Sequence, residues 1–374
     1  MTRLIFWGSA AVLFYTYAGY AVWLWLRRRL WPRPVHVGPC SPAISIVLVV
    51  RNAVQVLERK LRNLEDLSYP PDRVEIVVVS DGSTDGTNEI LSRYQKDEHL
   101  RVILRPEQCG KAAGINDAVA LTRGEVVVFT DARQKLEPPA VRLMLENFAD
   151  PEVGGVSGEL MLGDPLSGEA GKGMGLYWRI EKAIRELESA SGSVVGATGA
   201  IYAVRRHLLV PLPPETVLDD VYIPMHVVKQ GARVVFEARA RAWDVPDQGG
   251  TREFARKVRT LSGNYQLLQL APWLLTKANP VRFEFLSHKL LRLLAPFFLA
   301  GFLLSSAFLP GPIYRGAFCL QVAFYGFSLL AIARVKRGPL ARIADVAFTF
   351  VVLNTAAVVA FINFVSGRKA VWIQ

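Results

Sequence analysis

The stretch Val74-Glu-Ile-Val-Val-Val-Ser-Asp-Gly-Ser-Thr-Asp-Gly-Thr87 decides the fold, because it joins a buried strand, a glycine-rich turn and the start of a helix. Residues 74–79 are mainly β-branched and apolar at successive positions, which is typical of a strand covered on both faces. The segment from Gly82 to Thr87 is rich in residues that favour turns and helix starts. A strand that leads through such a turn into a helix is the unit of an α/β fold, so we expect a sheet covered by helices.

The residues on both sides of this stretch repeat the same alternation. Further strands are predicted at residues 43–50, 101–104 and 126–130, and helices at 52–67, 87–94, 111–121 and 139–148. This order predicts a parallel, doubly wound sheet, in which ligands bind beyond the carboxyl ends of the strands. The residues that directly follow each strand are therefore the first candidates for a binding site.

The chain as a whole is too apolar for an ordinary soluble enzyme. Of its 374 residues 51% are hydrophobic and only 21% are charged, and the formal net charge is +11. This composition excludes a disordered or fibrous protein. The three cysteines lie far apart in the sequence, which excludes a disulfide framework and a cysteine-based zinc site.

Uncharged segments long enough to cross a membrane account for the apolar character. They lie at residues 4–26, 293–314, 316–333 and 346–367. Arginines follow the first segment at residues 27–29, and positive charge behind an apolar run indicates a retained anchor rather than a cleaved signal. The positive-inside rule then places the central block in the cytoplasm, so we expect a multi-pass protein of the cell membrane. The last segment either spans the membrane or re-enters it, because Arg368 and Lys369 follow it.

These features divide the chain into four parts. We expect an N-terminal transmembrane anchor at residues 1–30, a cytoplasmic α/β domain at 38–250, amphipathic interfacial helices at 251–289 and a C-terminal transmembrane region at 290–374. Much of the positive charge then faces lipid or sets the topology. Because the sequence shows no zinc finger, RNA-binding signature or basic–aromatic alternation, nucleic acid is not expected as a partner.

Acidic residues stand at the tips of two predicted strands. Asp81 follows one of them, and Asp131 follows another. Carboxylates at that edge can hold a divalent cation, or they can hydrogen-bond a ribose or a base. A single acid in such a place commonly caps a helix, which is the better explanation of Asp85. Two acids on tandem strands favour a shared binding site.

Basic residues near these strand tips suit an anionic ligand. Lys111 opens a predicted helix, where it either contacts an anion or is a solvated lysine of the first turn. Arg252, Arg256 and Arg259 share one face of a later predicted helix. That face can close over a diphosphate or lie against anionic lipid headgroups. We favour the diphosphate for Arg259 and assign the neighbouring Lys257 to lipid.

A pair of acids, Asp219 and Asp220, precedes a predicted helix at residues 221–230. One acid can cap that helix while the other removes a proton as a general base. We expect Asp219 to cap the helix and Asp220 to act as the base, although the reverse division also fits the pattern.

Taken in order, these motifs resemble the family 2 glycosyltransferases. The chain is most similar to their membrane-embedded branch, which includes cellulose, hyaluronan and poly-N-acetylglucosamine synthases. The matching segments are Val49-Val-Arg-Asn52, Asp81-Gly-Ser-Thr-Asp-Gly-Thr87, Gly110-Lys-Ala112 with Asn116, Thr130-Asp-Ala132, Gly196-Ala-Thr-Gly-Ala-Ile-Tyr-Ala-Val204, Leu218-Asp-Asp220 and the arginine-rich helix at 252–269. Together they cover nearly the whole chain.

The resemblance implies a GT-A type, Rossmann-like domain with a mixed sheet, one leading transmembrane helix and about three trailing ones. It implies that Asp81 contacts the uracil or ribose of the donor and that Asp131 binds its diphosphate through Mg²⁺ or Mn²⁺. Asp220 would be the general base. The other residues implied on the donor side are Asn52, Lys111, Arg133, Arg256 and Arg259, and those on the acceptor side are Thr198, Gly199 and Asp219.

Two departures from the family pattern affect the metal and the product. Where the family has Asp-x-Asp, this chain has Asp131-Ala-Arg133, so either the metal loses a ligand or Arg133 neutralises phosphate directly. The processive branch carries Gln-x-x-Arg-Trp, whereas this chain has Arg256-Lys-Val-Arg-Thr260 and lacks the tryptophan. The second departure favours one or a few transfers over the synthesis of a long polymer.

The sequence thus predicts an inverting hexosyltransferase. It would move a sugar from a nucleotide-diphosphate sugar, we expect a UDP-sugar, to a hydroxyl of a lipid-linked or saccharide acceptor at the cytoplasmic membrane face. Inversion follows when one base takes the acceptor proton and attack comes opposite the departing diphosphate. The alternatives are a processive polysaccharide synthase with translocation, and a non-catalytic membrane protein that binds a nucleotide sugar.

Overall fold

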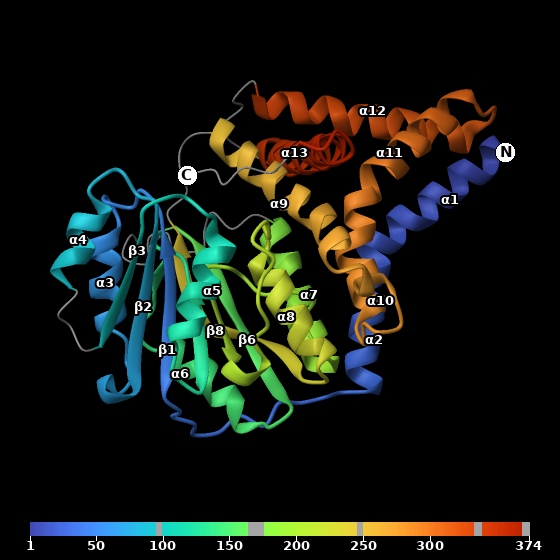
Figure 1. The fold of residues 1–374 in the computed structure, drawn as a ribbon. Helices are drawn as coiled ribbons and strands as arrows, with labels where there is room; N and C mark the ends of the chain where they lie inside the picture. Colours follow the sequence, from blue (N-terminus) through green and yellow to red (C-terminus); the bar gives the residue numbers. More distant parts are fainter. Residues whose placement is uncertain (95–98, 164–175, 245–249, 333–338, 369–374) are drawn as a thin grey trace.

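The computed structural model describes residues 1–94, 99–163, 176–244, 250–332 and 339–368. An α/β domain stands beside a group of long helices that come from both ends of the chain (Figure 1). The α/β domain contains the predicted strand-and-turn stretch, and the long helices contain the predicted apolar segments.

The described part of the chain forms one eight-stranded sheet in the order β3-β2-β1-β4-β7-β6-β8-β5. The strands are β1 (Ile44–Val50), β2 (Val74–Asp81), β3 (Leu100–Arg105), β4 (Val126–Thr130), β5 (Lys135–Leu136), β6 (Val153–Leu162), β7 (Ile201–Arg205) and β8 (Arg233–Asp244). The parallel arrangement is confirmed for β3, β2, β1 and β4.

The complete sheet is mixed, because the later strands β7 and β5 pair antiparallel with their neighbours. The expectation of a parallel arrangement came from the strands up to residue 130, and it holds for them. Strand β7 runs antiparallel between β4 and β6, with Thr130 opposite Ile201. The chain enters β7 from a turn that lies at the tip of β4, where the Thr130 hydroxyl donates to the Ala200 carbonyl. A strand entered at that edge must run back along its neighbour. The mixed sheet that the family resemblance implied is therefore the correct one.

Helices cover both faces of the sheet. They are α3 (Leu57–Glu65), α4 (Thr87–Arg93), α5 (Lys111–Leu121), α6 (Ala140–Leu145), α7 (Leu176–Ser191) and α8 (Asp219–Lys229). Successive residues of β1 point to opposite faces. The side chains of Ile46 and Leu48 pack in one core with α3, α4 and α6, and those of Val47 and Val49 pack in the other with α5 and α8. This double burial explains the continuous apolar run of β1.

One predicted helix is shorter than expected. The helix expected at residues 52–67 begins only at Leu57. It cannot begin at Asn52, because Asn52 has a positive φ of 48°, outside the range of a right-handed helix. The Asn52 side chain instead accepts the Thr84 N–H at 2.8 Å. This contact ties the end of β1 to the loop that follows β2.

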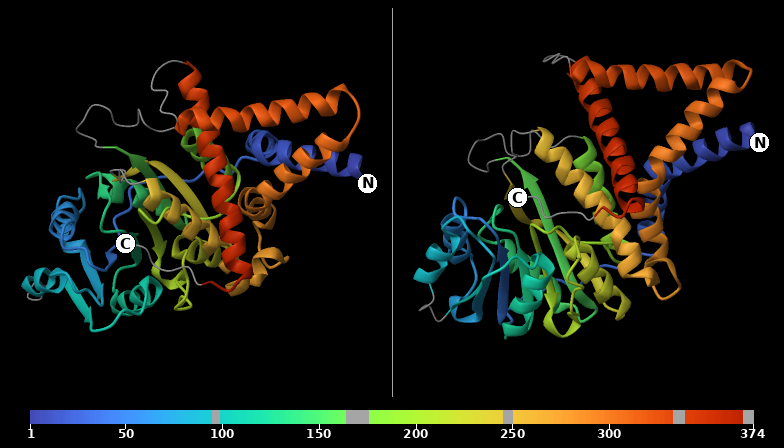
Figure 2. Two further views of the ribbon diagram at one scale, coloured as in Figure 1. Left: turned by 90° about the horizontal axis from the view of Figure 1, so that it is seen from above. Right: turned by 45° about the horizontal axis from the view of Figure 1, so that its top comes forward.

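The long helices are α1 (Thr2–Phe14) and α2 (Tyr20–Leu30) at the N-terminus, and α9 (Gly250–Leu270), α11 (Leu291–Phe308), α12 (Pro312–Ile332) and α13 (Pro339–Val365) toward the C-terminus. The short α10 (Arg282–Phe285) lies between α9 and α11 in the chain. Helix α1 packs along α11, and α9 packs along α13. Helices α11, α12 and α13 form three sides of a triangle (Figure 2).

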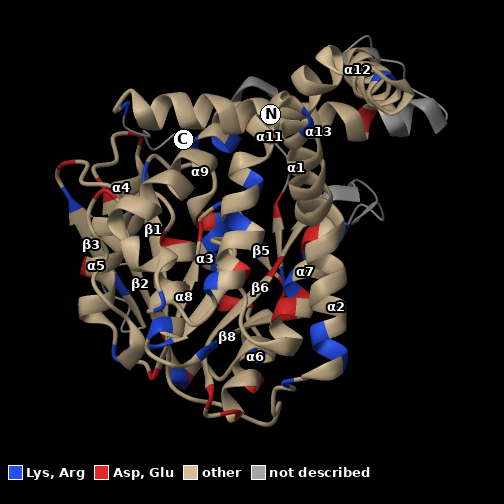
Figure 3. Ribbon diagram, turned by 90° about the vertical axis from the view of Figure 1, so that its right-hand side faces the viewer, with Lys and Arg blue, Asp and Glu red and all other residues tan. Residues whose placement is uncertain are grey.

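Among the described residues, three helical stretches are long and apolar enough to cross a membrane: Thr2–Leu30, Arg282–Phe308 and Ala344–Val365. They contain most of the predicted segments 4–26, 293–314 and 346–367. The fourth predicted segment, 316–333, falls on α12 and its end lies outside the described residues. Helices α1 and α11 are mostly free of charge, whereas the last turn of α2 is basic (Figure 3).

Candidate active site

The predicted site residues of three elements meet at one edge of the sheet. Lys111 is the first residue of α5, and its Nζ lies 2.9 Å from Asp131 Oδ1 and 3.1 Å from Asp219 Oδ1. Burial alone would lower the pKa of Lys111, but the two carboxylates outweigh it and hold that pKa above its ordinary value. The lysine is therefore charged, and it links the tip of β4 to the start of α8.

Asp131 and Asp220 face each other across Gly199. The Gly199 N–H donates to Asp220 Oδ2 at 3.0 Å. A Cβ at Gly199 would lie 3.3 Å from Asp220 Oδ2 and 3.6 Å from Asp131 Oδ2, which shows how near the two carboxylates come to this residue. The sequence analysis expected Asp81 and Asp131 to share one binding site. The structure brings Asp131 together with Lys111, Gly199, Asp219 and Asp220. Their roles in binding and catalysis stay predictions.

Asp220 is the unusual acid of this cluster. Burial and the neighbouring Asp219 carboxylate raise its pKa to about 6, although Lys111 acts in the opposite direction. A carboxylate with such a pKa is a stronger base than an ordinary aspartate and is still mostly ionised at neutral pH. The arrangement suits removal of a proton from a hydroxyl.

Asp219 does not cap α8, so that expectation is wrong. The residue at the capping position is Leu218, and Asp219 begins the helix itself. The Asp219 side chain is buried, where it accepts a hydrogen bond from the Tyr202 hydroxyl at 3.0 Å and pairs with Lys111. A charged partner stabilises a buried carboxylate more than a backbone N–H does, which explains why Asp219 points to Lys111.

Tyr202 was missed by the sequence analysis, although it lies inside the quoted segment 196–204. Burial and the two neighbouring aspartates raise its pKa well above the ordinary value. Its hydroxyl therefore keeps its proton and acts as a donor to Asp219.

Asp81 lies at the tip of β2 as expected, but its carboxylate is fully buried. Its two oxygens accept the backbone N–H groups of Cys109 and Gly110 at 2.8 and 2.9 Å. Asp81 thus fixes the turn that immediately precedes Lys111. A contact between Asp81 and the base or ribose of a donor stays a prediction.

The other strand-tip residues are held by neighbouring loops. Asp85 accepts the N–H of Thr87, the first residue of α4, and so supports that helix start from just outside the capping position, which Gly86 occupies. Arg133 pairs with Asp244 at the end of β8, with Nη2 2.6 Å from Oδ2. A phosphate contact of Arg133 stays a prediction.

Helix α9 lies against the segment that leads to the acid pair. Gln266 accepts the Val217 N–H at 3.0 Å, and a Cβ at Gly263 would lie 2.7 Å from Leu218 Cγ. The Nε of Arg259 is buried and has no hydrogen-bond partner among the described residues, so it is available to an anion.

The remaining basic residues of α9 are less informative. Lys257 pairs with Glu253 of the same helix, which does not support its assignment to lipid. Arg256 is half-buried on α9. Away from this helix, the predicted acceptor-side residue Thr198 donates its N–H to the Ser157 hydroxyl at 3.1 Å. The side chain of Arg252 lies outside the described residues. Roles of Arg256 and Thr198 in binding stay predictions.

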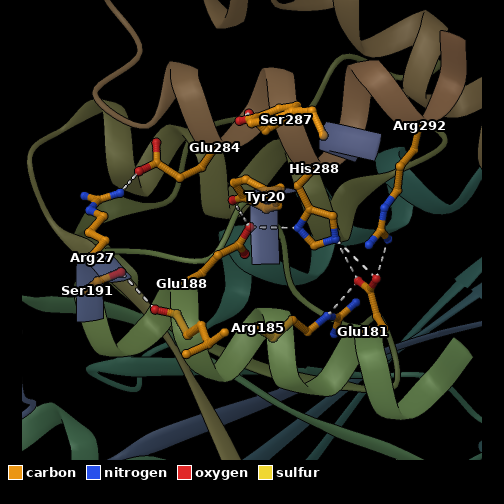
Figure 4. Close-up of polar contacts among 12 residues, drawn as sticks. Tyr20, Arg27, Glu181, Arg185, Glu188, Ser191, Glu284, Ser287, His288 and Arg292 are labelled. Atoms are coloured by element: carbon orange, nitrogen blue, oxygen red, sulfur yellow. Dashed lines mark hydrogen bonds and ion pairs between the residues drawn. The ribbon is translucent and has the colours of Figure 1, made fainter. Parts of the chain in front are cut away.

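A second cluster of buried charge joins the membrane helices to the α/β domain. Glu181 and Glu188 of α7 point to His288, whose Nε2 and Nδ1 lie 3.1 and 2.8 Å from their carboxylates (Figure 4). The Tyr20 hydroxyl of α2 donates to Glu188 at 2.6 Å, and Arg292 of α11 donates to Glu181 at 2.6 Å. This junction cluster was not foreseen, because no sequence spacing connects residues so far apart.

Among the residues that the structure describes, no group of three or more His, Cys, Asp and Glu side chains is placed to hold a metal ion. Asp131, Asp219, Asp220 and Lys111 together form what we call the strand-tip cluster. Asp131 stands at its exposed side, with 39% of its side chain accessible. One of its oxygens pairs with Lys111, and the other faces the space above Gly199. It fits a cation that draws its remaining ligands from a bound phosphate group.

Comparison with known proteins connects this geometry to a family. Residues 45–210 match the glycosyl transferase family 2. The poly-beta-1,6-N-acetyl-D-glucosamine synthase of Staphylococcus aureus is 23% identical over 234 residues, which cover 60% of this chain and 55% of that protein. The beta-monoglucosyldiacylglycerol synthase of a Nostoc species is 25% identical over 249 residues, which cover 63% and 52%. The chain spans about half the length of these curated relatives.

The fold has a solved counterpart over its full length. The mannosyltransferase PcManGT from Pyrobaculum calidifontis, solved in complex with GDP-Man and Mn²⁺, matches 99% of this chain and 100% of its own, with a TM-score of 0.73 and 21% identity. The match confirms the expected GT-A fold. The resemblance to family 2 glycosyltransferases is confirmed over residues 45–210.

Proposed function

We propose that this chain, which carries a glycosyl transferase family 2 domain at residues 45–210, transfers a sugar from a nucleotide-diphosphate sugar to an acceptor hydroxyl with inversion at the anomeric carbon. The observation that supports this most directly is the pairing of Asp131 and Asp220 across Gly199. One carboxylate is placed for the donor phosphates and the other for the acceptor proton.

Asp220 acts as the general base. The Gly199 N–H holds its Oδ2, which leaves Oδ1 to take the proton of the acceptor hydroxyl. The deprotonated oxygen forms a bond to the anomeric carbon while the bond from that carbon to the diphosphate oxygen breaks. Because attack comes from the side opposite the leaving group, one such step inverts the configuration.

The leaving diphosphate needs positive charge nearby. Lys111 lies within the same cluster. Arg259 of α9 has a buried Nε without a hydrogen-bond partner among the described residues, and we propose that it supplies further positive charge to the diphosphate. Asp131 would hold Mg²⁺ or Mn²⁺ together with phosphate oxygens of the donor, and the bound cation would stabilise the charge of the diphosphate. The structurally similar PcManGT was solved with GDP-Man and Mn²⁺, which agrees with a divalent cation in the proposed reaction.

The structure of the long helices supports a lipid-linked acceptor. A cavity of about 350 Å³ opens between α11, α12 and α13. Its lining is apolar except at two side chains, Gln321 and Tyr325, which hydrogen-bond to each other at 2.6 Å. A lipid chain matches such walls, whereas a passing polysaccharide requires polar ones. The name of the Nostoc relative, a glycolipid synthase, agrees with this choice.

A processive polysaccharide synthase is the second candidate, and the Staphylococcus aureus relative favours it by name. The absence of a tryptophan from Arg256-Lys-Val-Arg-Thr260 and the apolar cavity argue against a long polymer. A non-catalytic nucleotide-sugar-binding protein is the third candidate, motivated by Arg133 in place of a second metal-binding acid.

We place the α/β domain on the cytoplasmic side of the cell membrane. The basic last turn of α2, at Arg27, Arg28 and Arg29, lies where the chain leaves the first membrane helix for the domain. Positive charge in that place favours the cytoplasmic face. The proposed division of the chain is the one predicted from the sequence: a leading anchor, a central domain, interfacial helices and a C-terminal membrane region.

The test is a turnover assay with full-length protein in lipid nanodiscs. UDP-glucose, UDP-N-acetylglucosamine and GDP-mannose are each supplied with Mg²⁺ or Mn²⁺, and release of the nucleotide diphosphate is measured with and without added membrane lipid. The expected result is release from one donor that rises with lipid and yields a labelled, lipid-extractable product. Long water-soluble products would identify the synthase, and donor binding without release would identify the non-catalytic protein.

A further inference from the structure

A buried lysine lies directly beneath the strand-tip cluster. Lys60 of α3 is only 1% exposed, and its Nζ donates hydrogen bonds to the Thr130 hydroxyl and to the Gln134 carbonyl, both at 2.8 Å. Lysine is almost never fully buried unless its ammonium group is well hydrogen-bonded, because removal of the charge from water is costly. Burial of the Lys60 amine therefore costs free energy that apolar packing does not recover, which indicates a role beyond packing.

The two acceptors of Lys60 lie on either side of Asp131 in the sequence. Thr130 is the last residue of β4, and Gln134 precedes β5. One turn further along α3, Asn63 donates to the Leu136 carbonyl and accepts the Leu136 N–H, at 2.8 and 2.7 Å. Helix α3 thus fixes the segment 130–136 at both of its ends.

The hydrogen bonds continue from Lys60 to the other half of the cluster. The Thr130 hydroxyl, which accepts from Lys60, donates to the Ala200 carbonyl at 2.9 Å. Ala200 follows Gly199, whose N–H holds the Asp220 carboxylate. One amine therefore connects the loop that bears Asp131 with the turn that holds Asp220.

We propose that Lys60 is a positioning residue that sets the separation between Asp131 and Asp220. It touches neither the donor nor the acceptor, and it acts through Thr130, Gln134 and Ala200. The proposal rests on the glycosyl transfer described above, because the separation matters only if the two carboxylates act on one bound donor–acceptor pair. Small errors of placement are costly in such reactions, since a shift of about 1 Å can cost about 100-fold in rate.

The experiment compares three variants of the full-length chain. Lys60→Met keeps most of the volume and removes the hydrogen bonds, Lys60→Arg keeps a charged donor, and Arg62→Met removes an exposed cation from the same helix. For Lys60→Met we expect kcat to fall between about 10- and 100-fold while the donor KM changes less than about threefold. Lys60→Arg should recover part of kcat, and Arg62→Met should equal the wild type.

A second readout does not depend on turnover. Amide hydrogen exchange in Lys60→Met should become faster at residues 131–136 and 198–201 and remain unchanged along β2. Unchanged exchange at both segments would overturn the positioning role whether or not the protein proves to be a transferase. Absence of turnover in the wild type would overturn the proposed function and leave the exchange result to decide the role of Lys60.

Two further outcomes bear on whether Lys60 is a positioning residue. Equal loss of kcat and donor affinity, with faster exchange throughout the domain, would show a merely structural lysine. If Lys60→Met does not fold, the same measurements on Lys60→Gln, which keeps one hydrogen-bond donor, replace it with the same expected pattern in weaker form.

Discussion

The strand-tip cluster and the junction cluster are both groups of mostly buried ionisable side chains, but they differ in charge balance. At the junction, the cations of Arg185 and Arg292 and the imidazole of His288 surround Glu181. Burial alone would raise the pKa of Glu181, but His288 and the arginines hold it well below the ordinary value. At the strand tips, in contrast, burial and a second carboxylate raise the pKa of Asp220.

The difference separates an acid that holds structure from an acid placed for chemistry. Glu181 is saturated with donors, so it connects three segments of the chain and has little basicity left. At the strand tips Asp131, Asp219 and Asp220 gather around Lys111, which leaves an excess of negative charge. Such an excess is a common feature of functional sites, since a cationic ligand or a proton relieves it.

The largest effect is expected from the acid with the raised pKa. Asp220→Asn removes the proposed base while it keeps the shape of the side chain, so turnover should fall by about 100- to 10,000-fold with donor binding retained. The measurement is nucleotide diphosphate release alongside donor titration. Asp72→Asn, an exposed aspartate outside the cluster, is the control. Turnover equal to the wild type would remove Asp220 from the mechanism.

A smaller loss is expected from the cation of the cluster. Lys111→Met leaves Asp131 and Asp219 without their shared partner, so turnover should fall by about 100-fold. Lys111 lowers the pKa of Asp220, so its removal should also move the acid limb of the pH–rate profile to higher pH. An acid limb that stays in place would show that the lysine does not act on Asp220.

The pH dependence of the wild type gives a further test of the comparison. A base works only when it is unprotonated, and Asp220 has a pKa of about 6 instead of the ordinary value near 4. We expect kcat to be constant above about pH 7 and to fall about tenfold for each pH unit below about 6. A profile that stays flat to about pH 4.5 would show that the catalytic carboxylate has an ordinary environment.

The smallest effect on turnover is expected at the junction. Glu181→Gln removes the buried carboxylate that pairs with His288, Arg185 and Arg292, which should lower stability by about 3 kcal/mol. The midpoint of thermal unfolding should fall by about 6 to 12 °C. At a temperature where the variant is folded, turnover should remain within about threefold of the wild type. Glu186→Gln, an exposed position on the same helix, is the control and should change neither value. A loss of turnover of about 100-fold in Glu181→Gln would show that the junction cluster also acts in catalysis.

Much of the sheet could be predicted from local pattern. The bounds of β4 and α5 agree with the prediction, because a run of β-branched residues and a helix start after glycine are signals that lie within the segment itself. The start of α3 was misplaced because Asn52 is held by a loop that follows another strand. The direction of β7 depends on where the preceding turn attaches, which no local pattern shows.

In the candidate site, too, the features set by local sequence could be predicted and those set by distant contacts could not. Asp131 and Asp220 could be proposed from strand-tip position and from family resemblance, and the structure brings them together at Gly199. The burial of Asp81 could not be foreseen, because its partners Cys109 and Gly110 are remote in sequence. Lys60 could have been found from the sequence, because it falls on the apolar face of α3. A lysine on such a face needs a buried hydrogen-bond acceptor.

The most direct test of the account is an experimental structure of the full-length protein with Mn²⁺ and the nucleotide diphosphate of its preferred donor. The account predicts the diphosphate beside Asp131 and Lys111, with the Asp220 carboxylate turned to the open space beyond it. A nucleotide bound elsewhere on the domain, or phosphates separated from Asp131 by the width of the sheet, would contradict the assignment of this edge as the catalytic site.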